Sequence, residues 1–136
     1  MPAALSFSID VGDLATVMFN LPDRPVNTMT RQAWAELDSI LQKIETAKPA
    51  GVIIASSKPK IFIAGADLHE ISVMNDDQLR GYLIEGQRIL LRLEHLPMPT
   101  VAVLSGDALG GGLELALACK MRVASDEPSI QLGLPE

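Results

Sequence analysis

The sequence predicts an α/β fold with parallel strand pairings, because short apolar strands and amphipathic helices alternate along its whole length. The strands in the middle of the chain are continuous apolar runs, which is typical of a sheet that is buried on both faces. Proline and glycine mark the ends of these runs, and no internal repeat or interdomain linker interrupts them. We therefore expect a single domain with right-handed connections between its parallel strands.

The first predicted elements are a β-hairpin and a helix. Apolar residues alternate with polar ones in residues 5–9 and again in 15–19, and Gly12-Asp13 marks the turn between them. After a loop at 21–25, apolar residues recur at helical spacing from Trp34 to Ile44. Thr28 or Thr30 is the candidate N-cap, and Pro49 ends this helix.

Two strands and a second helix are predicted next. Residues 52–55 and 61–64 are the short apolar runs of buried strands. The second helix is expected from about Asp76 to Leu96, where Pro97 and Pro99 end it. Its apolar stripe consists of Leu79, Leu83, Ile89, Leu90 and Leu93.

The last third of the chain carries the pattern with the clearest chemical meaning. A strand at 100–104 and a triple glycine at 110–112 precede a short apolar helix at 113–119, and a further strand is expected around 121–124. A glycine run at a helix N-terminus leaves backbone N–H groups uncovered, so that they can hold developing negative charge. Glu114 and Glu136 bracket this run in the sequence. The combination favours acid/base chemistry on a carbonyl compound.

Composition excludes several other classes. The chain is 48% hydrophobic and 21% charged, which does not fit a disordered segment. A net charge of −6 without a Lys/Arg cluster argues against a nucleic-acid partner. The single cysteine, Cys119, is expected to be a buried apolar residue in a reducing compartment, and His69 and His95 are expected at the surface without metal-ligand spacing. No apolar run approaches the roughly 20 residues of a membrane span, and no leader is visible, so we expect a soluble, cytoplasmic protein.

Four ordered motifs resemble the signatures of the enoyl-CoA hydratase/isomerase (crotonase) family. They are Arg24-Pro25-Val26-Asn27, the segment 61–68 (Ile-Phe-Ile-Ala-Gly-Ala-Asp-Leu), the segment 110–119 (Gly-Gly-Gly-Leu-Glu-Leu-Ala-Leu-Ala-Cys) and Gly133-Leu134-Pro135-Glu136. Four motifs in order are far more specific than one glycine pattern. The resemblance covers essentially the whole chain and implies a crotonase-like right-handed spiral of β-β-α units, the ClpP/crotonase fold. Residues 1–136 would be the N-terminal part of such a domain, incomplete at the C-terminus.

The resemblance also implies a role for each matching residue. The backbone N–H groups of Ala66 and Gly111 would hold the thioester oxygen of an acyl-CoA, each donor contributing about 3 kcal/mol. Glu114 and Glu136 would position one water and add it across the double bond. The implied substrate-binding positions are Arg24, Val26, Ala64, Gly65, Ala66, Asp67, Leu68, Gly110 and Gly111. No metal or cofactor is implied, because coenzyme A is part of the substrate.

A finer resemblance is to the hydratase region of bifunctional fatty-acid oxidation complex α subunits. The separation of Glu114 and Glu136 is slightly longer than in single-function hydratases, and the segment 125–128 (Ser-Asp-Glu-Pro) points the same way. An oligomer is implied, a trimer if single-function and a thiolase-associated complex if bifunctional. Lys120 stands where the family usually has Asp, which affects a local structural contact. Further spiral turns would follow Glu136, so we expect this chain alone neither to fold fully nor to catalyse.

The expected activity is hydration of trans-2-enoyl-CoA to 3-hydroxyacyl-CoA in fatty-acid β-oxidation. A Δ3-Δ2-enoyl-CoA isomerase is the nearest alternative, since it needs the same oxyanion hole but only one glutamate. A non-catalytic crotonase-fold binding or assembly protein would be favoured if Glu114 pointed away from Ala66 and Gly111. Each motif taken singly also has a structural explanation. The glycines can permit close packing, and the helix dipole favours a carboxylate such as Glu114 in the first turn of a helix. Lys58 and Lys60 could meet the phosphates of coenzyme A, although a solvated loop is the plainer interpretation.

Overall fold

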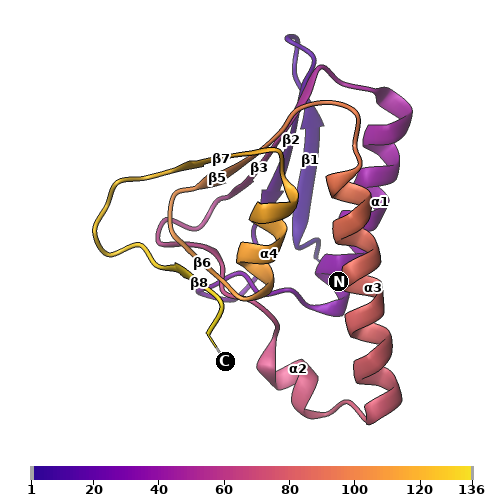
Figure 1. Ribbon diagram of the computed structural model, residues 1–136, viewed down its shortest axis with the longest axis vertical. Coiled ribbons are helices and arrows are strands. Elements are labelled where there is room, and N and C mark those ends of the chain that lie inside the picture. The colour runs from indigo at the N-terminus through magenta and orange to yellow at the C-terminus, as the bar shows by residue number, and fades with distance from the viewer. Residues whose placement is uncertain (1, 136) are drawn as a thin grey trace.

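The computed structural model describes residues 2–135 as two β-sheets with four helices packed beside them (Figure 1). In chain order the elements are β1 (Leu5–Ile9), β2 (Leu14–Phe19), α1 (Arg31–Ala47), β3 (Gly51–Ser56), β4 (Ile61–Ile63), α2 (Leu68–Ser72), α3 (Asp76–Glu94), β5 (Thr100–Leu104), β6 (Asp107–Leu109), α4 (Gly111–Ala118), β7 (Met121–Ala124) and β8 (Leu132–Gly133). Helices α1 and α3 lie side by side along one flank of the larger sheet (Figure 1).

From β3 onwards, successive strands of the chain alternate between the two sheets. The larger sheet has the order β1-β2-β3-β5-β7, and the smaller one has the order β4-β6-β8. Each of the pairs β3–β4, β5–β6 and β7–β8 therefore contributes one strand to each sheet, and helices follow the first three strand pairs of the chain as repeating β-β-α units. β1 and β2 are antiparallel, and the other strand pairs are parallel. The predicted α/β class, the hairpin and the parallel pairings are confirmed.

Helix α1 begins where a threonine caps it. The Thr30 side chain accepts a hydrogen bond from the Ala33 amide at 3.0 Å, so Thr30 rather than Thr28 is the N-cap. The helix ends at Ala47, and the C-cap residue Lys48 adopts a left-handed conformation with φ of 50°. Its buried face is apolar and includes Trp34, Leu37 and Leu41.

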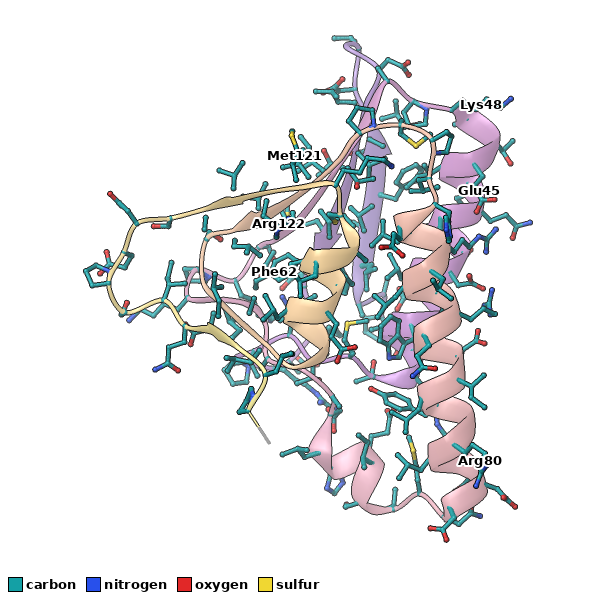
Figure 2. The ribbon with its side chains drawn as sticks, in the orientation of Figure 1. Glu45, Lys48, Phe62, Arg80, Met121 and Arg122 are labelled. Atoms are coloured by element: carbon teal, nitrogen blue, oxygen red, sulfur yellow. The ribbon has the colours of Figure 1, made fainter. Side chains whose placement is uncertain are left out.

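Helix α3 begins as predicted but buries less of its apolar stripe. Asn75 and Gln78 form a capping box before and within its first turn. Ile89 and Leu93 are fully buried, whereas the side chain of Leu83 is 52% exposed. The first half of α3 extends with α2 beyond the sheets (Figure 1), and Arg80 there points away from the body of the protein (Figure 2). The predicted five-residue stripe is therefore wrong in its N-terminal part, and the helix ends at Glu94 rather than Leu96.

Three short elements are absent from the sequence prediction. Helix α2 and strands β6 and β8 have five, three and two residues, too few to show a hydrophobic period. Strand β6 lies between the predicted strand at 100–104 and the glycine run. Strand β7, by contrast, is predicted correctly, although it lies at the sheet edge and all its residues are exposed.

Two contacts attach neighbouring segments to β4 of the smaller sheet. A Cβ on Gly112 would lie 2.2 Å from the Ile63 carbonyl oxygen, so α4 rests directly on β4 because residue 112 has no side chain. The buried side chain of Asn27 accepts a hydrogen bond from the Leu21 amide at 3.0 Å and donates to the Phe62 carbonyl at 3.0 Å. Phe62 lies inside, behind α4 (Figure 2). No helix within residues 2–135 is long and apolar enough to cross a membrane.

Candidate active site

The candidate site is built where the chain leaves two neighbouring strands of the smaller sheet. β4 and β6 are parallel, so the loops at their carboxyl ends lie at the same edge of the sheet. Gly65 and Gly110 occupy these loops with positive φ angles of 104° and 53°. A Cβ on Gly65 would lie 3.1 Å from the Leu109 oxygen and 3.7 Å from the Gly111 nitrogen. The two loops therefore touch backbone to backbone, which side chains at these positions would prevent.

The amides of Ala66 and Gly111 are unused at this contact. Among the hydrogen bonds formed by residues 2–135, neither N–H group has an acceptor. Their neighbouring carbonyls are occupied, since the Met29 amide donates to Gly65 O at 2.7 Å and the Glu114 amide donates to Gly110 O at 3.0 Å. Each free N–H belongs to a peptide group whose carbonyl is already held. That arrangement fixes the direction of the N–H and increases its donor strength.

Both residues border one pocket of about 230 Å³. Ala66, Gly111 and Glu114 line it from the loops and from α4, and we call it the site pocket. The remaining lining residues come mainly from α1 and α3 and from Met29: they are Met29, Trp34, Tyr82, Leu83, Gly86, Gln87 and Leu90. The loops that carry Ala66 and Gly111 lie at the same edge of the smaller sheet, and within residues 2–135 neither N–H group is used in secondary structure. The catalytic roles of these residues stay predictions.

The second predicted glutamate, Glu136, lies outside the described residues. The segment that leads to it is nevertheless placed, because β8 pairs with β6 and the Gly110 amide donates to the Gly133 carbonyl at 2.9 Å. The chain thus passes along the glycine loop of the candidate site three residues before Glu136.

Asp67 anchors the loop that carries Ala66. Its buried carboxylate accepts hydrogen bonds from the Glu70 amide at 2.9 Å and from the Thr28 hydroxyl at 3.1 Å, and it forms an ion pair with Arg24. Burial works against ionisation of Asp67, but these hydrogen bonds and the Arg24 charge outweigh it and lower the pKa of the carboxyl. The ion pair therefore holds the N-terminal loop against the loop of Ala66.

The structure separates the nine predicted substrate-binding residues into groups. Only Ala66 and Gly111 line the site pocket. Gly65, Gly110, Arg24 and Asp67 shape or anchor its loops, and the amide of Ala64 donates to the Asn27 carbonyl. Val26 and Leu68 are exposed, at 37% and 79%, and lie outside the pocket lining. Any contact of these residues with a substrate stays a prediction.

Tyr82 and Gly86 are site residues that the sequence analysis missed. The Tyr82 hydroxyl donates to the Met29 carbonyl at 2.5 Å, which ties α3 to the strand-like segment bridged to Ala66. Burial, and then the nearby carboxylates, raise the pKa of Tyr82, so it remains a neutral donor. Gly86 appears within a helical apolar pattern, and a glycine at such a position signals close packing.

Other predicted features are placed as follows. Cys119 is buried, and burial raises the pKa of its thiol to about 11. The Lys58 ammonium donates to the carbonyls of Leu21 and Arg24, so it braces the N-terminal loop. Lys120 donates to the Leu96 and Met98 carbonyls, and both histidines are exposed. Residues 2–135 contain no cluster of acidic, His and Cys side chains that could hold a metal ion.

Comparisons with known proteins find a matching family and several similar structures. Residues 12–136 match the enoyl-CoA hydratase/isomerase family. An enoyl-CoA hydratase from Bacillus anthracis is 35% identical, with a TM-score of 0.88 over 96% of this chain and 50% of its own. DspI from Pseudomonas aeruginosa is 29% identical, with a TM-score of 0.87 over 98% of this chain and 53% of its own. An enoyl-CoA hydratase/carnitine racemase from Magnetospirillum magneticum is 29% identical, with a TM-score of 0.84 over 97% of this chain and 51% of its own. The chain spans about half the length of these structures.

Proposed function

Since the chain belongs to the enoyl-CoA hydratase/isomerase family, we propose that the intact protein hydrates trans-2-enoyl-CoA to 3-hydroxyacyl-CoA. One observation carries this proposal. Within residues 2–135 the amides of Ala66 and Gly111 have no acceptor, and both residues line a pocket that Glu114 also lines. Two fixed donors beside a carboxylate are what an enolate-forming reaction on a thioester requires.

In the proposed reaction the thioester oxygen accepts hydrogen bonds from Ala66 and Gly111. The hydroxyl of a water bonds to C3, the electron pair of the C2–C3 double bond moves to C1–C2, and the carbonyl pair moves onto oxygen. The charge on that oxygen is larger in the transition state than in the substrate, so the two amides stabilise the transition state selectively. Each is expected to contribute about 3 kcal/mol.

The two glutamates account for the protons in this proposal. One carboxylate, of Glu114 or Glu136, accepts a proton from the attacking water, while the other carboxyl group donates a proton to C2 as the enolate collapses. Proton exchange between the two groups and solvent restores the starting state. The net change is the addition of one water, and no cofactor takes part.

Isomerisation is the second candidate because of one specific observation. Glu114 is the sole acidic residue lining the site pocket within residues 2–135. A single carboxylate that removes a proton from C2 and returns it at C4 would suffice for a Δ3-Δ2-enoyl-CoA isomerase. A non-catalytic binding role is less favoured, since Glu114 lines the same pocket as the two free amides.

The finer assignments rest on the sequence alone. We infer a place in β-oxidation and an oligomer from the resemblance, and a cytoplasmic location from the single cysteine and the composition of the chain. The similar structures do not single out the bifunctional α subunits. A thiolase-associated complex and a trimer therefore both stay predictions.

The test is the rate of crotonyl-CoA hydration by the intact protein, followed by the loss of enoyl-thioester absorbance. Glu114→Gln is expected to lower kcat by about 10²-fold or more, because it removes one partner in proton transfer. Glu127→Gln is the matched control, since Glu127 is exposed and lies outside the site pocket. A Glu114→Gln protein that hydrates crotonyl-CoA at the wild-type rate would contradict the proposal.

A further inference from the structure

Met29 contacts both loops of the candidate site. Its backbone N–H donates to the Gly65 carbonyl at 2.7 Å, and that carbonyl belongs to the peptide group that carries the free N–H of Ala66. Its side chain lies near the other loop, since a Cβ on Gly111 would be 3.9 Å from Met29 Cγ. Met29 is only 1% exposed, so both contacts are made inside the protein. One residue thus lies against both loops that carry the proposed oxyanion donors.

The Met29 backbone is held from the other side by helix α3. The hydroxyl of Tyr82, which is half-buried on α3, donates to the Met29 carbonyl at 2.5 Å. Burial raises the pKa of Tyr82 above its ordinary value of 10.0, so the hydroxyl keeps its proton and remains a donor at neutral pH. The carbonyl of Met29 is therefore engaged by α3, and its N–H is engaged by the loop of Ala66.

We propose that Tyr82 is a positioning residue of the oxyanion site, because its hydroxyl holds Met29 and Met29 holds the Gly65–Ala66 peptide. The inference rests on the function proposed above and gives Tyr82 no contact with the reacting atoms. Preorganised donors stabilise a transition state because they do not have to reorient as charge develops. Without the hydroxyl, Met29 and the peptide that it binds gain freedom, and the Ala66 donor loses part of this advantage.

The decisive variant is Tyr82→Phe, which removes the hydroxyl and keeps the ring that borders the site pocket. In the intact protein it is expected to lower kcat for crotonyl-CoA hydration by about tenfold, the rate equivalent of one lost hydrogen bond, and to change KM by less than about twofold. Thr46→Val is the matched control. The Thr46 hydroxyl also donates to a backbone carbonyl, that of Gln42 at 3.1 Å, but it is exposed on α1 and lies outside the site pocket. Its loss should leave both constants unchanged.

A spectroscopic measurement reports on the oxyanion donors without turnover. Hydrogen bonds to a thioester carbonyl lower its stretching frequency, so infrared difference spectra of bound butyryl-CoA, isotopically labelled at that carbonyl, report on these contacts. The wild type is expected to lower the frequency relative to free butyryl-CoA, and Tyr82→Phe to lose part of this shift. Thr46→Val should keep the whole shift. A hydroxyl that only stabilised the fold would leave the frequency of the bound ligand unchanged.

The route through the Gly65–Ala66 peptide is tested by combining two variants. Gly65→Ala displaces this peptide by itself, because Gly65 has a φ of 104° that alanine rarely adopts. In that background Tyr82→Phe should lower kcat by less than about threefold, since both changes disturb the same donor. An equal tenfold fall in the wild-type and Gly65→Ala backgrounds would overturn the proposed route.

A folded Tyr82→Phe protein with full kcat and an unchanged carbonyl frequency would overturn the inference. A loss of stability without a change in the frequency would overturn it as well. The infrared readout separates this inference from the proposed function, because butyryl-CoA has no double bond to hydrate. The predicted frequency changes in a protein that hydrates no enoyl-CoA would retain the role of Tyr82 and remove the hydratase assignment. Hydration that Tyr82→Phe leaves unaltered would remove the role of Tyr82 alone.

Discussion

Replacing Gly65 by alanine is a direct perturbation of the proposed oxyanion site. Gly65 has a φ of 104°, and an added Cβ would lie 3.1 Å from the Leu109 oxygen. A non-glycine residue in such a conformation costs on the order of 1–3 kcal/mol. The chain can relieve this strain by rotating the Gly65–Ala66 peptide, and that rotation turns the Ala66 N–H away from its present direction.

The expected result for Gly65→Ala is a fall in kcat of about 10²–10³-fold for crotonyl-CoA hydration by the intact protein, the effect of removing one oxyanion donor. KM should change much less, because the donor acts mainly in the transition state. Gly81→Ala is the control: its Cβ meets no atom within 4 Å, so it should leave kcat unchanged and stabilise α3 by roughly 0.5–1 kcal/mol. A Gly65→Ala protein with full kcat and an unaltered unfolding midpoint would refute this reasoning.

Three further predictions concern single side chains. Glu114→Gln should reduce Δ3-Δ2 isomerisation at least as much as hydration, because Glu114 is the acidic residue that lines the site pocket within residues 2–135; isomerisation at the wild-type rate would exclude Glu114 as its base. The lowered pKa of Asp67 contributes stability that is present above its ordinary value of 3.8 and is lost as pH falls through the folded-state value. Asp67→Asn should therefore flatten the dependence of the free energy of unfolding on pH below 3.8, and a dependence identical to the wild type's would exclude this contribution. Cys119, with a pKa of about 11, should resist alkylation at pH 8 until the protein is denatured; rapid labelling of the native protein would contradict its burial.

The elements that could be predicted from the sequence are those with enough residues to show a period. Helix α1 has 17 residues, with apolar spacing from Ala33 to Ile44 and an N-cap threonine, and the hairpin has a clear alternation on each side of Gly12-Asp13. Strands β6 and β8 are defined by their partners instead, because two or three residues acquire strand geometry only when a neighbouring strand is in place. The exposure of Leu83 could not be predicted either, because an apolar stripe does not show which part of a helix extends beyond the core.

The candidate site was predictable only in part for a similar reason. Gly65 and the 110–112 run stand out because glycine alone tolerates the backbone contact between the two loops. The two glycine segments lie close together because β4 pairs with β6 in parallel, and a local sequence pattern does not predict that pairing. Tyr82 lies 53 positions from the Met29 carbonyl that it binds. Such a tertiary hydrogen bond leaves no mark in a single sequence.

The most direct test of the account is a crystal structure of the intact protein with a bound, unreactive acyl-CoA thioester. The account predicts that the thioester oxygen lies about 3 Å from both the Ala66 and the Gly111 nitrogens, with the Glu114 carboxylate on the same side of the pocket. A thioester oxygen bound elsewhere, or either amide turned onto a protein acceptor in the complex, would contradict it.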